Sequence, residues 1–267
     1  MDPLIQIIIL AVVQGIAEFL PVSSSGHLAL LSHLMGITED SELITIVLHA
    51  GTLVSILVYY AKDILAIIKD KDTKTIKLLI IATLPLVVLA YPLKKLISNA
   101  HENLYIVAAC WFLTGFILIV VHKGKDCTKE LTEMSPKHAF FIGLMQCIAV
   151  LPGVSRSGST ISIASRLDYK GNDAARFSFL MGIPAIGGAI ILHIKDLAEK
   201  IQADTMQTES ISALHLGLGF IISLIVGYFS LSILIKTLKK GKFSWFGYYC
   251  IVLAVICIGI KYSGGET

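Results

Sequence analysis

The stretch Gln14–His27 reads QGIAEFLPVSSSGH, and Gln146–Ser159, 132 residues further along the chain, reads QCIAVLPGVSRSGS. Aligned without a gap, the two stretches are identical at seven of fourteen positions, which include glutamine, serine and glycine as well as apolar residues. The identical pairs are Gln14/Gln146, Ile16/Ile148, Ala17/Ala149, Val22/Val154, Ser23/Ser155, Ser25/Ser157 and Gly26/Gly158. Because polar residues are among those shared, we interpret the two stretches as copies of one repeated unit.

Each copy interrupts an apolar region. The apolar segments before and after the interruption are each too short to cross a membrane. Residues 4–20 precede the first polar stretch and residues 28–35 follow it, whereas residues 138–151 and 160–167 flank the second. A helix of eight residues is about 12 Å long and one of fourteen about 21 Å, against a bilayer core of about 30 Å. Irregular backbone at membrane depth is allowed only where protein or water satisfies it. We therefore predict two re-entrant hairpins, each with a polar turn at depth.

The sequence as a whole has the composition of a membrane protein. Of the 267 residues, 55% are hydrophobic and 15% charged, compared with about 25% charged in soluble proteins. This excludes a soluble enzyme, a disordered chain and a nucleic-acid-binding protein, and it predicts a single membrane domain over residues 1–267. Six uncharged runs are long enough, or nearly so, to cross a bilayer. They are Leu43–Ala61, Leu78–Leu93, Leu104–Val121, Phe177–Ile194, Ile211–Ile235 and Trp245–Ile260.

These patterns predict an all-α polytopic membrane protein with six transmembrane helices, two re-entrant helical hairpins and an inverted-topology internal repeat. Each repeat, approximately 1–122 and 138–261, contains one hairpin and three spans, and an odd number of spans inverts the second repeat. With the N-terminus outside, the inside segments carry sixteen Lys or Arg and the outside segments five. Basic residues favour the inside, so we expect both termini outside. The two polar turns would then meet within the membrane.

Glu18 and Arg156 are charged residues expected at membrane depth, where an ionisable side chain indicates a functional site. An ion pair that only holds the hairpins together is the alternative interpretation. Gln14 and Glu18 are four residues apart and therefore share one face of the first hairpin helix. His49, in an apolar run, is a further candidate for the wall of a polar cavity.

The two polar turns carry the residues expected to bind phosphate. Serine turns that lead into a helix form anion sites from hydroxyls and backbone N–H groups. The guanidinium of Arg156 matches phosphate oxygens in a bidentate manner, and the bilayer can hold a lipid tail. We therefore expect cleavage of a lipid-linked phosphate, with Glu18, Ser24, His27 and Arg156 as catalytic candidates. The phosphate-binding candidates are Ser23, Ser25, Gly26, Ser155, Ser157, Gly158 and Thr160.

The segments Gln14–His27, Pro152–Thr160 and Phe177–Pro184 (FSFLMGIP) resemble the undecaprenyl-diphosphatase family of the bacitracin-resistance type. This resemblance implies hydrolysis of undecaprenyl diphosphate to undecaprenyl phosphate and inorganic phosphate. The reaction recycles the lipid carrier for peptidoglycan in the bacterial plasma membrane and confers bacitracin resistance. The resemblance also implies an active site open to the outer face and a divalent cation, Mg²⁺ or Ca²⁺. Glu18 is the expected metal ligand, with Gln14 as its neighbour at a motif position where the family permits Glu or Gln.

The chemical roles stay open at this point. Arg156 and the turn amides would hold the diphosphate and stabilise its transition state. Ser24 or His27 would attack the terminal phosphorus, or His27 would activate a water. Glu18 would orient His27, accept a proton or hold the metal.

Two other functions share some of these features. Inverted repeats and broken helices are also found in transporters, so a flippase for undecaprenyl phosphate is the main alternative. The acid-phosphatase-like lipid phosphatases use related SGH and SR motifs, but Ser162 stands where their pattern requires histidine. The expected partners are undecaprenyl diphosphate and membrane lipid, without nucleic acid, and a homodimer is left open.

Overall fold

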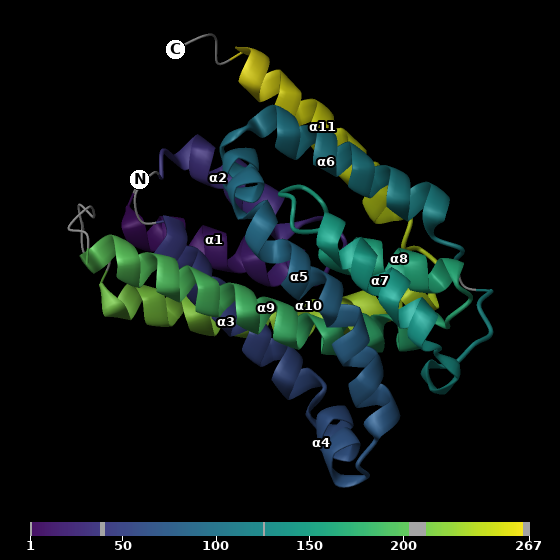
Figure 1. The fold of residues 1–267 in the computed structure, drawn as a ribbon. Helices are drawn as coiled ribbons and strands as arrows, with labels where there is room; N and C mark the ends of the chain where they lie inside the picture. The colour runs from purple at the N-terminus through teal and green to yellow at the C-terminus, as the bar shows by residue number, and fades with distance from the viewer. Residues whose placement is uncertain (1, 38–40, 125, 203–211, 264–267) are drawn as a thin grey trace.

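The computed structural model describes residues 2–37, 41–124, 126–202 and 212–263. Within these ranges it contains eleven α-helices, a π-helical segment, η1, a 3₁₀ turn, η2, and no β-strand (Figure 1). The elements are α1 (Pro3–Ala17), α2 (Ser24–Met35), α3 (Ser41–Tyr59), α4 (Ala61–Lys69), α5 (Thr73–Glu102), α6 (Leu104–Phe116), η1 (Ile117–Val121), η2 (Leu131–Glu133), α7 (Pro136–Ile148), α8 (Arg156–Arg166), α9 (Gly171–Gln202), α10 (Ala213–Lys239) and α11 (Trp245–Ser263). The all-helical fold predicted from the sequence is confirmed.

Short polar residues fix where several of these helices begin. The Asp2 carboxylate accepts a hydrogen bond from the backbone N–H of Leu4 at 2.8 Å, and Pro3 follows as the first residue of α1. Ser135 caps α7 in the same way and is also followed by a proline. A cap satisfies one of the N–H groups that lack partners in the first turn, and proline at that position has no N–H to satisfy.

The two hairpins, α1–α2 and α7–α8, differ in one respect from the sequence prediction. The polar turns are shorter than expected, because Ser24 already opens α2 and Arg156 opens α8. The preceding serines cap these helices: Ser23 Oγ accepts from the N–H of Gly26 at 3.3 Å, and Ser155 Oγ accepts from that of Gly158 at 3.1 Å. The predicted phosphate-binding residues after each cap therefore occupy a helical first turn.

Among the described residues, four helical segments are long and apolar enough to cross a membrane: α6 together with η1, most of α9, the whole of α10, and most of α11. The pair α3 and α4 counts as a fifth if it is one span, although it is bent by 63°. These helices show a multi-pass membrane protein. The predicted run Leu78–Leu93 lies within α5, but the side chains of residues 90–99 lie outside the described part. The first residue of the run Ile211–Ile235 is likewise outside it.

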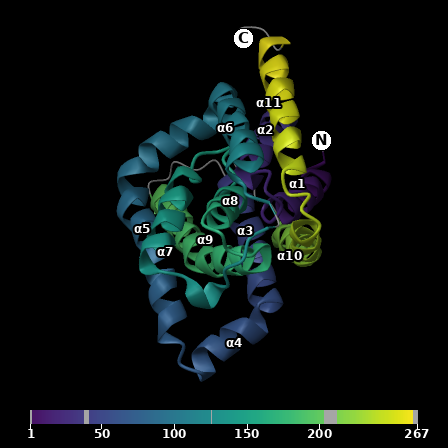
Figure 2. The same ribbon diagram turned by 90° about the vertical axis from the view of Figure 1, so that its right-hand side faces the viewer.

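Each hairpin packs against a helix from the other half of the chain. Helix α10 packs against α1 and α3, whereas α5 packs against α7, and α6 lies along α11 (Figures 1 and 2). Helices α3 and α9 meet between the two groups. Each hairpin is thus supported by a helix that lies far from it in the sequence.

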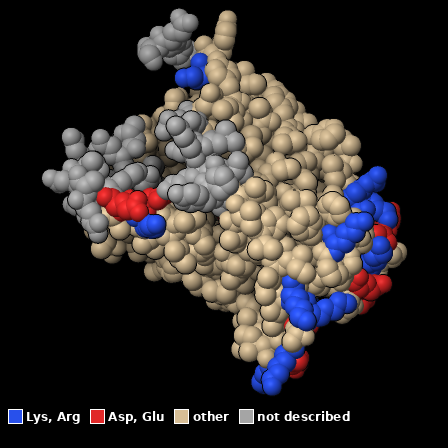
Figure 3. All heavy atoms as spheres, in the orientation of Figure 1, with Lys and Arg blue, Asp and Glu red and all other residues tan. Residues whose placement is uncertain are grey.

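The surface agrees with a membrane location. Large apolar side chains such as Val87, Phe229 and Val252 are more than half exposed, as expected for groups that face lipid. On the face shown in Figure 3, most Lys and Arg side chains lie along the lower right of the molecule, from α4 to the right-hand edge beside α7 and α8, while the broad middle is almost uncharged. The core between the helices consists mainly of aliphatic residues, and it also contains aromatic side chains such as Phe19, Trp111 and Phe177, none of which is exposed.

Candidate active site

The tips of the two hairpins meet through an ion pair. Nη2 of Arg156 donates to Oε1 of Glu18 at 2.8 Å, which joins residues 138 positions apart in the sequence. The two side chains are only 13% and 8% exposed, respectively. Charges this deeply buried are costly unless they are paired. The structure therefore brings together the two charged residues that the sequence singled out.

The second oxygen of Glu18 accepts a short hydrogen bond from a serine. Ser24 Oγ donates to Glu18 Oε2 at 2.7 Å, from the first residue of α2. The amide of Gln14 also donates to this oxygen, at 3.2 Å, as expected from their spacing on one helix face. The same amide nitrogen lies 3.4 Å from Oγ1 of Thr52 on α3. The carboxylate is thus held in a fixed orientation with a hydroxyl directly beside it.

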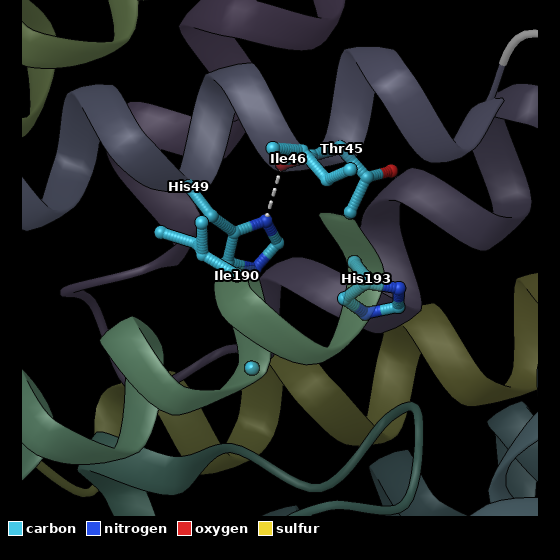
Figure 4. A pocket seen from close by; sticks show the side chains of 6 residues that line it. Thr45, Ile46, His49, Ile190 and His193 are labelled. Carbon is cyan, nitrogen blue, oxygen red and sulfur yellow. Dashed lines mark hydrogen bonds between the residues drawn. The ribbon is translucent and has the colours of Figure 1, made fainter. Parts of the chain in front are cut away.

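His49 approaches the carboxylate from α3. Its Nδ1 donates to the backbone carbonyl of Thr45 at 2.8 Å, and its Nε2 lies 3.8 Å from Glu18 Oε2. Figure 4 shows that the His49 ring and His193 face a small cavity between α3 and α9, with a volume of about 40 Å³. The residues that line this cavity do not include Glu18, so a role for His49 in the wall of the polar site stays a prediction.

Helix α9 supports the guanidinium of Arg156 from the other side. Nη1 donates to the carbonyl of Ser178 at 3.4 Å, and the guanidinium carbon lies 5.9 Å from the centre of the Phe179 ring. Gly182 provides the remaining space, because a Cβ built there would lie 2.2 Å from Nη1. This contact was not predicted from the sequence.

Several of the predicted phosphate-binding hydroxyls are used to build the turns. Ser23 Oγ accepts from the N–H of Gly153 at 3.1 Å and so links the first turn to the second. Thr160 Oγ1 donates to the carbonyl of Arg156 at 2.8 Å. The remaining serines pair within each turn, Ser25 with Ser23 and Ser157 with Ser155, both at 3.3 Å between hydroxyl oxygens.

His27 is oriented by groups other than Glu18. Its Nδ1 donates to the carbonyl of Ser23 at 2.7 Å, so its Nε2 accepts from the hydroxyl of Tyr249 at 2.8 Å. The ring also stacks on that of Tyr249, and Trp111 packs edge-on against it. No hydrogen bond joins His27 to Glu18 in the described part of the chain, which is against a direct orienting role for Glu18.

Three functional contacts came from residues that the sequence did not identify: Thr52, Ser178 and Tyr249. All three lie in apolar helices, where one hydroxyl among many apolar neighbours gives no local pattern. Thr52 lies three residues after His49 in the run Leu43–Ala61, and Ser178 lies in the segment FSFLMGIP. Neither position in the sequence indicates which other helix the side chain contacts. Only the packing of α3, α9 and α11 around the hairpins reveals these contacts.

The side chains around Glu18 offer few ligands for a divalent cation. The described ranges contain no group of three or more His, Cys, Asp or Glu side chains that could hold a metal. However, the buried Oε1 of Gln14 has no hydrogen-bond partner among the described residues, and the amide nitrogen of the same residue bonds Glu18. Mg²⁺ is commonly bound by one or two carboxylates together with substrate phosphates. The donors therefore fit a cation shared with a phosphorylated substrate, not an all-protein metal cage.

The fold and the site together define a multi-pass membrane protein with a buried carboxylate, hydroxyl and guanidinium where two broken helices meet. The family model for bacitracin resistance protein BacA matches residues 7–256. Because this match covers nearly the whole chain, the protein belongs to the BacA family.

Individual relatives support this assignment. The chain is 39% identical to an undecaprenyl-diphosphatase of Rhodopirellula baltica, over 97% of this chain and 98% of the relative. It is 36% identical to an undecaprenyl-diphosphatase of Carboxydothermus hydrogenoformans, with the same coverage. A further relative, undecaprenyl-diphosphatase 4 of Bacillus thuringiensis, is 36% identical over 96% of each chain.

Proposed function

We propose that this protein hydrolyses undecaprenyl diphosphate to undecaprenyl phosphate and inorganic phosphate. It thereby recycles the lipid carrier used in cell-wall synthesis and confers resistance to bacitracin. The observation that carries this function is the contact of Ser24, Glu18 and Arg156 at the meeting point of the hairpins. A buried hydroxyl, a base beside it and a guanidinium are the groups that phosphoryl transfer needs.

Ser24 is the nucleophile in this proposal, because its hydroxyl already donates to Glu18. The hydroxyl oxygen attacks the terminal phosphorus while Glu18 takes its proton, and the anhydride P–O bond breaks to release undecaprenyl phosphate. Arg156 binds the phosphoryl oxygens and stabilises their charge in the transition state. Glu18 then releases the proton taken from Ser24 to solvent. A water attacks the phosphoserine, and Glu18 takes a proton from that water and passes it to Ser24 Oγ as the Oγ–P bond breaks. Inorganic phosphate leaves, and the serine hydroxyl and the Glu18 carboxylate are both restored.

The proposed reaction also uses a divalent cation. Glu18 and the Oε1 of Gln14 would hold it, together with phosphate oxygens of the substrate. When bound, the cation neutralises part of the charge on the diphosphate. Gln14 keeps the carboxylate in place through its amide hydrogen bond whether or not the cation is present.

The proposed membrane arrangement follows from helix length and charge. Helices α1, α2, α7 and α8 contain 15, 12, 13 and 11 residues. The longest is therefore about 22 Å, shorter than the bilayer core of about 30 Å. This supports two re-entrant hairpins among six transmembrane helices, in inverted repeats spanning approximately 1–122 and 138–261.

The distribution of basic residues supports both termini on the outer face, and the family resemblance supports a site that opens on the same face. A homodimer stays a prediction, which the mass of the detergent-solubilised protein would test.

Phosphate release by the purified full-length protein in detergent tests the proposed function. Wild type should release phosphate from undecaprenyl diphosphate, and EDTA should prevent this. Ser24→Ala should abolish release, His27→Gln should reduce it, and Ser32→Ala, a matched serine change on α2, should leave it unchanged. Normal turnover in Ser24→Ala would rule out this nucleophile. A flippase without hydrolytic activity would release no phosphate in detergent.

A further inference from the structure

Helix α6 holds both polar turns in place, although it contributes no side chain to the ion pair. Two of its residues face the turns, Trp111 and Thr114, which are 0% and 1% exposed. They are three residues apart and so lie on the same face of the helix. The η1 segment continues α6 directly after this face and packs against α8. Such π-helical segments occur frequently at functional sites.

Thr114 holds the backbone of the second turn through two hydrogen bonds. Its Oγ1 donates to the carbonyl of Gly153 at 2.8 Å and accepts from the N–H of Ser155 at 3.1 Å. Ser155 is the cap of α8, and the next residue is Arg156. The hydroxyl therefore fixes the backbone directly before the residue that carries the guanidinium.

The second turn lies so close to α6 that only glycine fits at one position. Gly153 has φ of 97°, and a Cβ built there would lie 2.4 Å from the carbonyl oxygen of Val107. A residue in this left-handed conformation is favourable mainly as glycine. The close approach brings the Gly153 carbonyl within reach of the short Thr114 side chain.

Trp111 holds the first turn in the same manner. Its Nε1 donates to the carbonyl of Val22 at 3.0 Å. The next residue, Ser23, has φ of 67°, which is uncommon for a residue other than glycine. Because Ser23 Oγ also accepts from Gly153 N–H, each turn is attached both to α6 and to the other turn.

We propose that Thr114 is a positioning residue that sets the placement of Arg156 relative to Glu18 and Ser24. Among the described residues, its hydroxyl bonds only to backbone groups of the second turn, so it acts through the turn and does not contact the substrate. This inference rests on the proposed function for its kinetic consequence. A misplacement of about 1 Å at a reacting group is enough to lower a rate by about a hundredfold.

The test compares Thr114→Val, which keeps the shape and removes the hydroxyl, with Thr114→Ser, which keeps the hydroxyl. Thr83→Val is the matched control, since the Thr83 hydroxyl donates only to Leu79 within its own helix, at 2.8 Å. We expect Thr114→Val to lower kcat at least about tenfold, with a change in KM below about threefold. Thr114→Ser should recover kcat to within about threefold of wild type. Thr83→Val should behave as wild type.

Hydrogen exchange gives a second readout that does not depend on activity. The N–H of Ser155 should exchange faster in Thr114→Val than in wild type, Thr114→Ser or Thr83→Val, because its acceptor has been removed. Unchanged kcat in Thr114→Val would overturn the inference, and so would unchanged exchange at Ser155. If wild type releases no phosphate, the proposed function fails, but the exchange experiment still decides whether Thr114 holds the turn.

If Thr114→Val does not fold, Trp111→Phe tests the same principle on the first turn. This change removes the N–H donor to Val22 and keeps an aromatic ring in the core. It should lower kcat and speed exchange in the segment around Ser23, and wild-type values of both would contradict the inference.

Discussion

The two hairpins have the same plan but contribute different chemistry. In the alignment that relates them, Val150 stands opposite Glu18 and Arg156 stands opposite Ser24. The first hairpin thus supplies an acid and a hydroxyl, and the second supplies the cation. Neither hairpin contains a complete site, because the Glu18–Arg156 ion pair forms only between them.

The paired glutamines show the same division. The amide nitrogen of Gln14 donates to Glu18 and lies within hydrogen-bond reach of Thr52. The amide of Gln146 is buried, and neither its nitrogen nor its oxygen has a hydrogen-bond partner in the described part of the chain. Glutamine thus occupies the matching position in both hairpins, but only Gln14 hydrogen-bonds to a residue of the site.

The largest effect in this comparison should follow from a change that displaces Arg156 from Glu18 and so breaks the contact between the two hairpins. Gly182→Ala places a Cβ where the Arg156 guanidinium now lies, and the flexible end of the arginine will move more readily than the helix. We expect kcat/KM to fall by about a hundredfold, because the displaced guanidinium no longer meets the substrate correctly. Phosphate release by the purified variant measures this.

Gly188→Ala is the control for this change, since a Cβ there meets nothing within 4 Å. Its activity should match wild type, and its thermal stability should be equal or higher because alanine favours the helix. Equal activity in both variants would show that Arg156 does not need its present position.

An intermediate effect should distinguish the two glutamines. Gln14→Leu removes the donor to Glu18 and should lower kcat by about tenfold, the loss expected when a hydrogen bond to a charged group is removed. Gln146→Leu should leave kcat within about twofold of wild type, because it replaces a buried amide without partners by an apolar group. Steady-state kinetics of both variants provide the comparison. Inactivation of Gln146→Leu would mean that the second hairpin supplies more than Arg156.

The smallest effect concerns a residue outside both polar turns. The Lys123 ammonium and the Thr128 hydroxyl hydrogen-bond to Asp168, and they lower the pKa of its carboxyl below the ordinary value of 3.8. A lowered pKa in the folded state stabilises the fold above the unfolded-state pKa, and this contribution is lost as the pH falls through the folded-state pKa.

Thermal unfolding at neutral pH and below the ordinary pKa of the Asp168 carboxyl measures this contribution. Asp168→Asn should lower the unfolding temperature slightly at neutral pH and have less effect in acid. A larger difference in acid than at neutral pH would contradict the assignment of this pKa. Because Asp168 is partly exposed to solvent, the effect should be far smaller than those at the hairpin tips.

The sequence was sufficient to predict the main partners in the site. Glu18 and Arg156 stand out because charge at membrane depth is costly, and the aligned repeats place their hairpins opposite each other. The contact of Gln14 with Glu18 follows from helical spacing alone. In contrast, the support for His27 by Tyr249 and for Arg156 by Gly182 depends on which helices pack together. An apolar helix surface gives little indication of its partner, because lipid and protein neighbours are equally apolar.

The sequence contains a signal that helices begin at Ser24 and Arg156. Serine at each preceding position is a favourable cap, and the capped N–H groups of Gly26 and Gly158 follow at the usual spacing. The predicted turns are longer than the observed ones because serine and glycine, which are typical of loops, here form the first turn of each helix. The same residue types both end a loop and begin a helix, so composition alone does not separate the two.

The ion pair has a consequence for biosynthesis. Glu18 and Arg156 are 138 residues apart, and ribosomes add about 5 to 20 residues per second. The acid is therefore made about 7 to 28 s before the arginine that pairs with it. During that interval the nascent first hairpin carries an unneutralised carboxyl group. Water or the insertion machinery must accommodate it until the second half of the chain arrives.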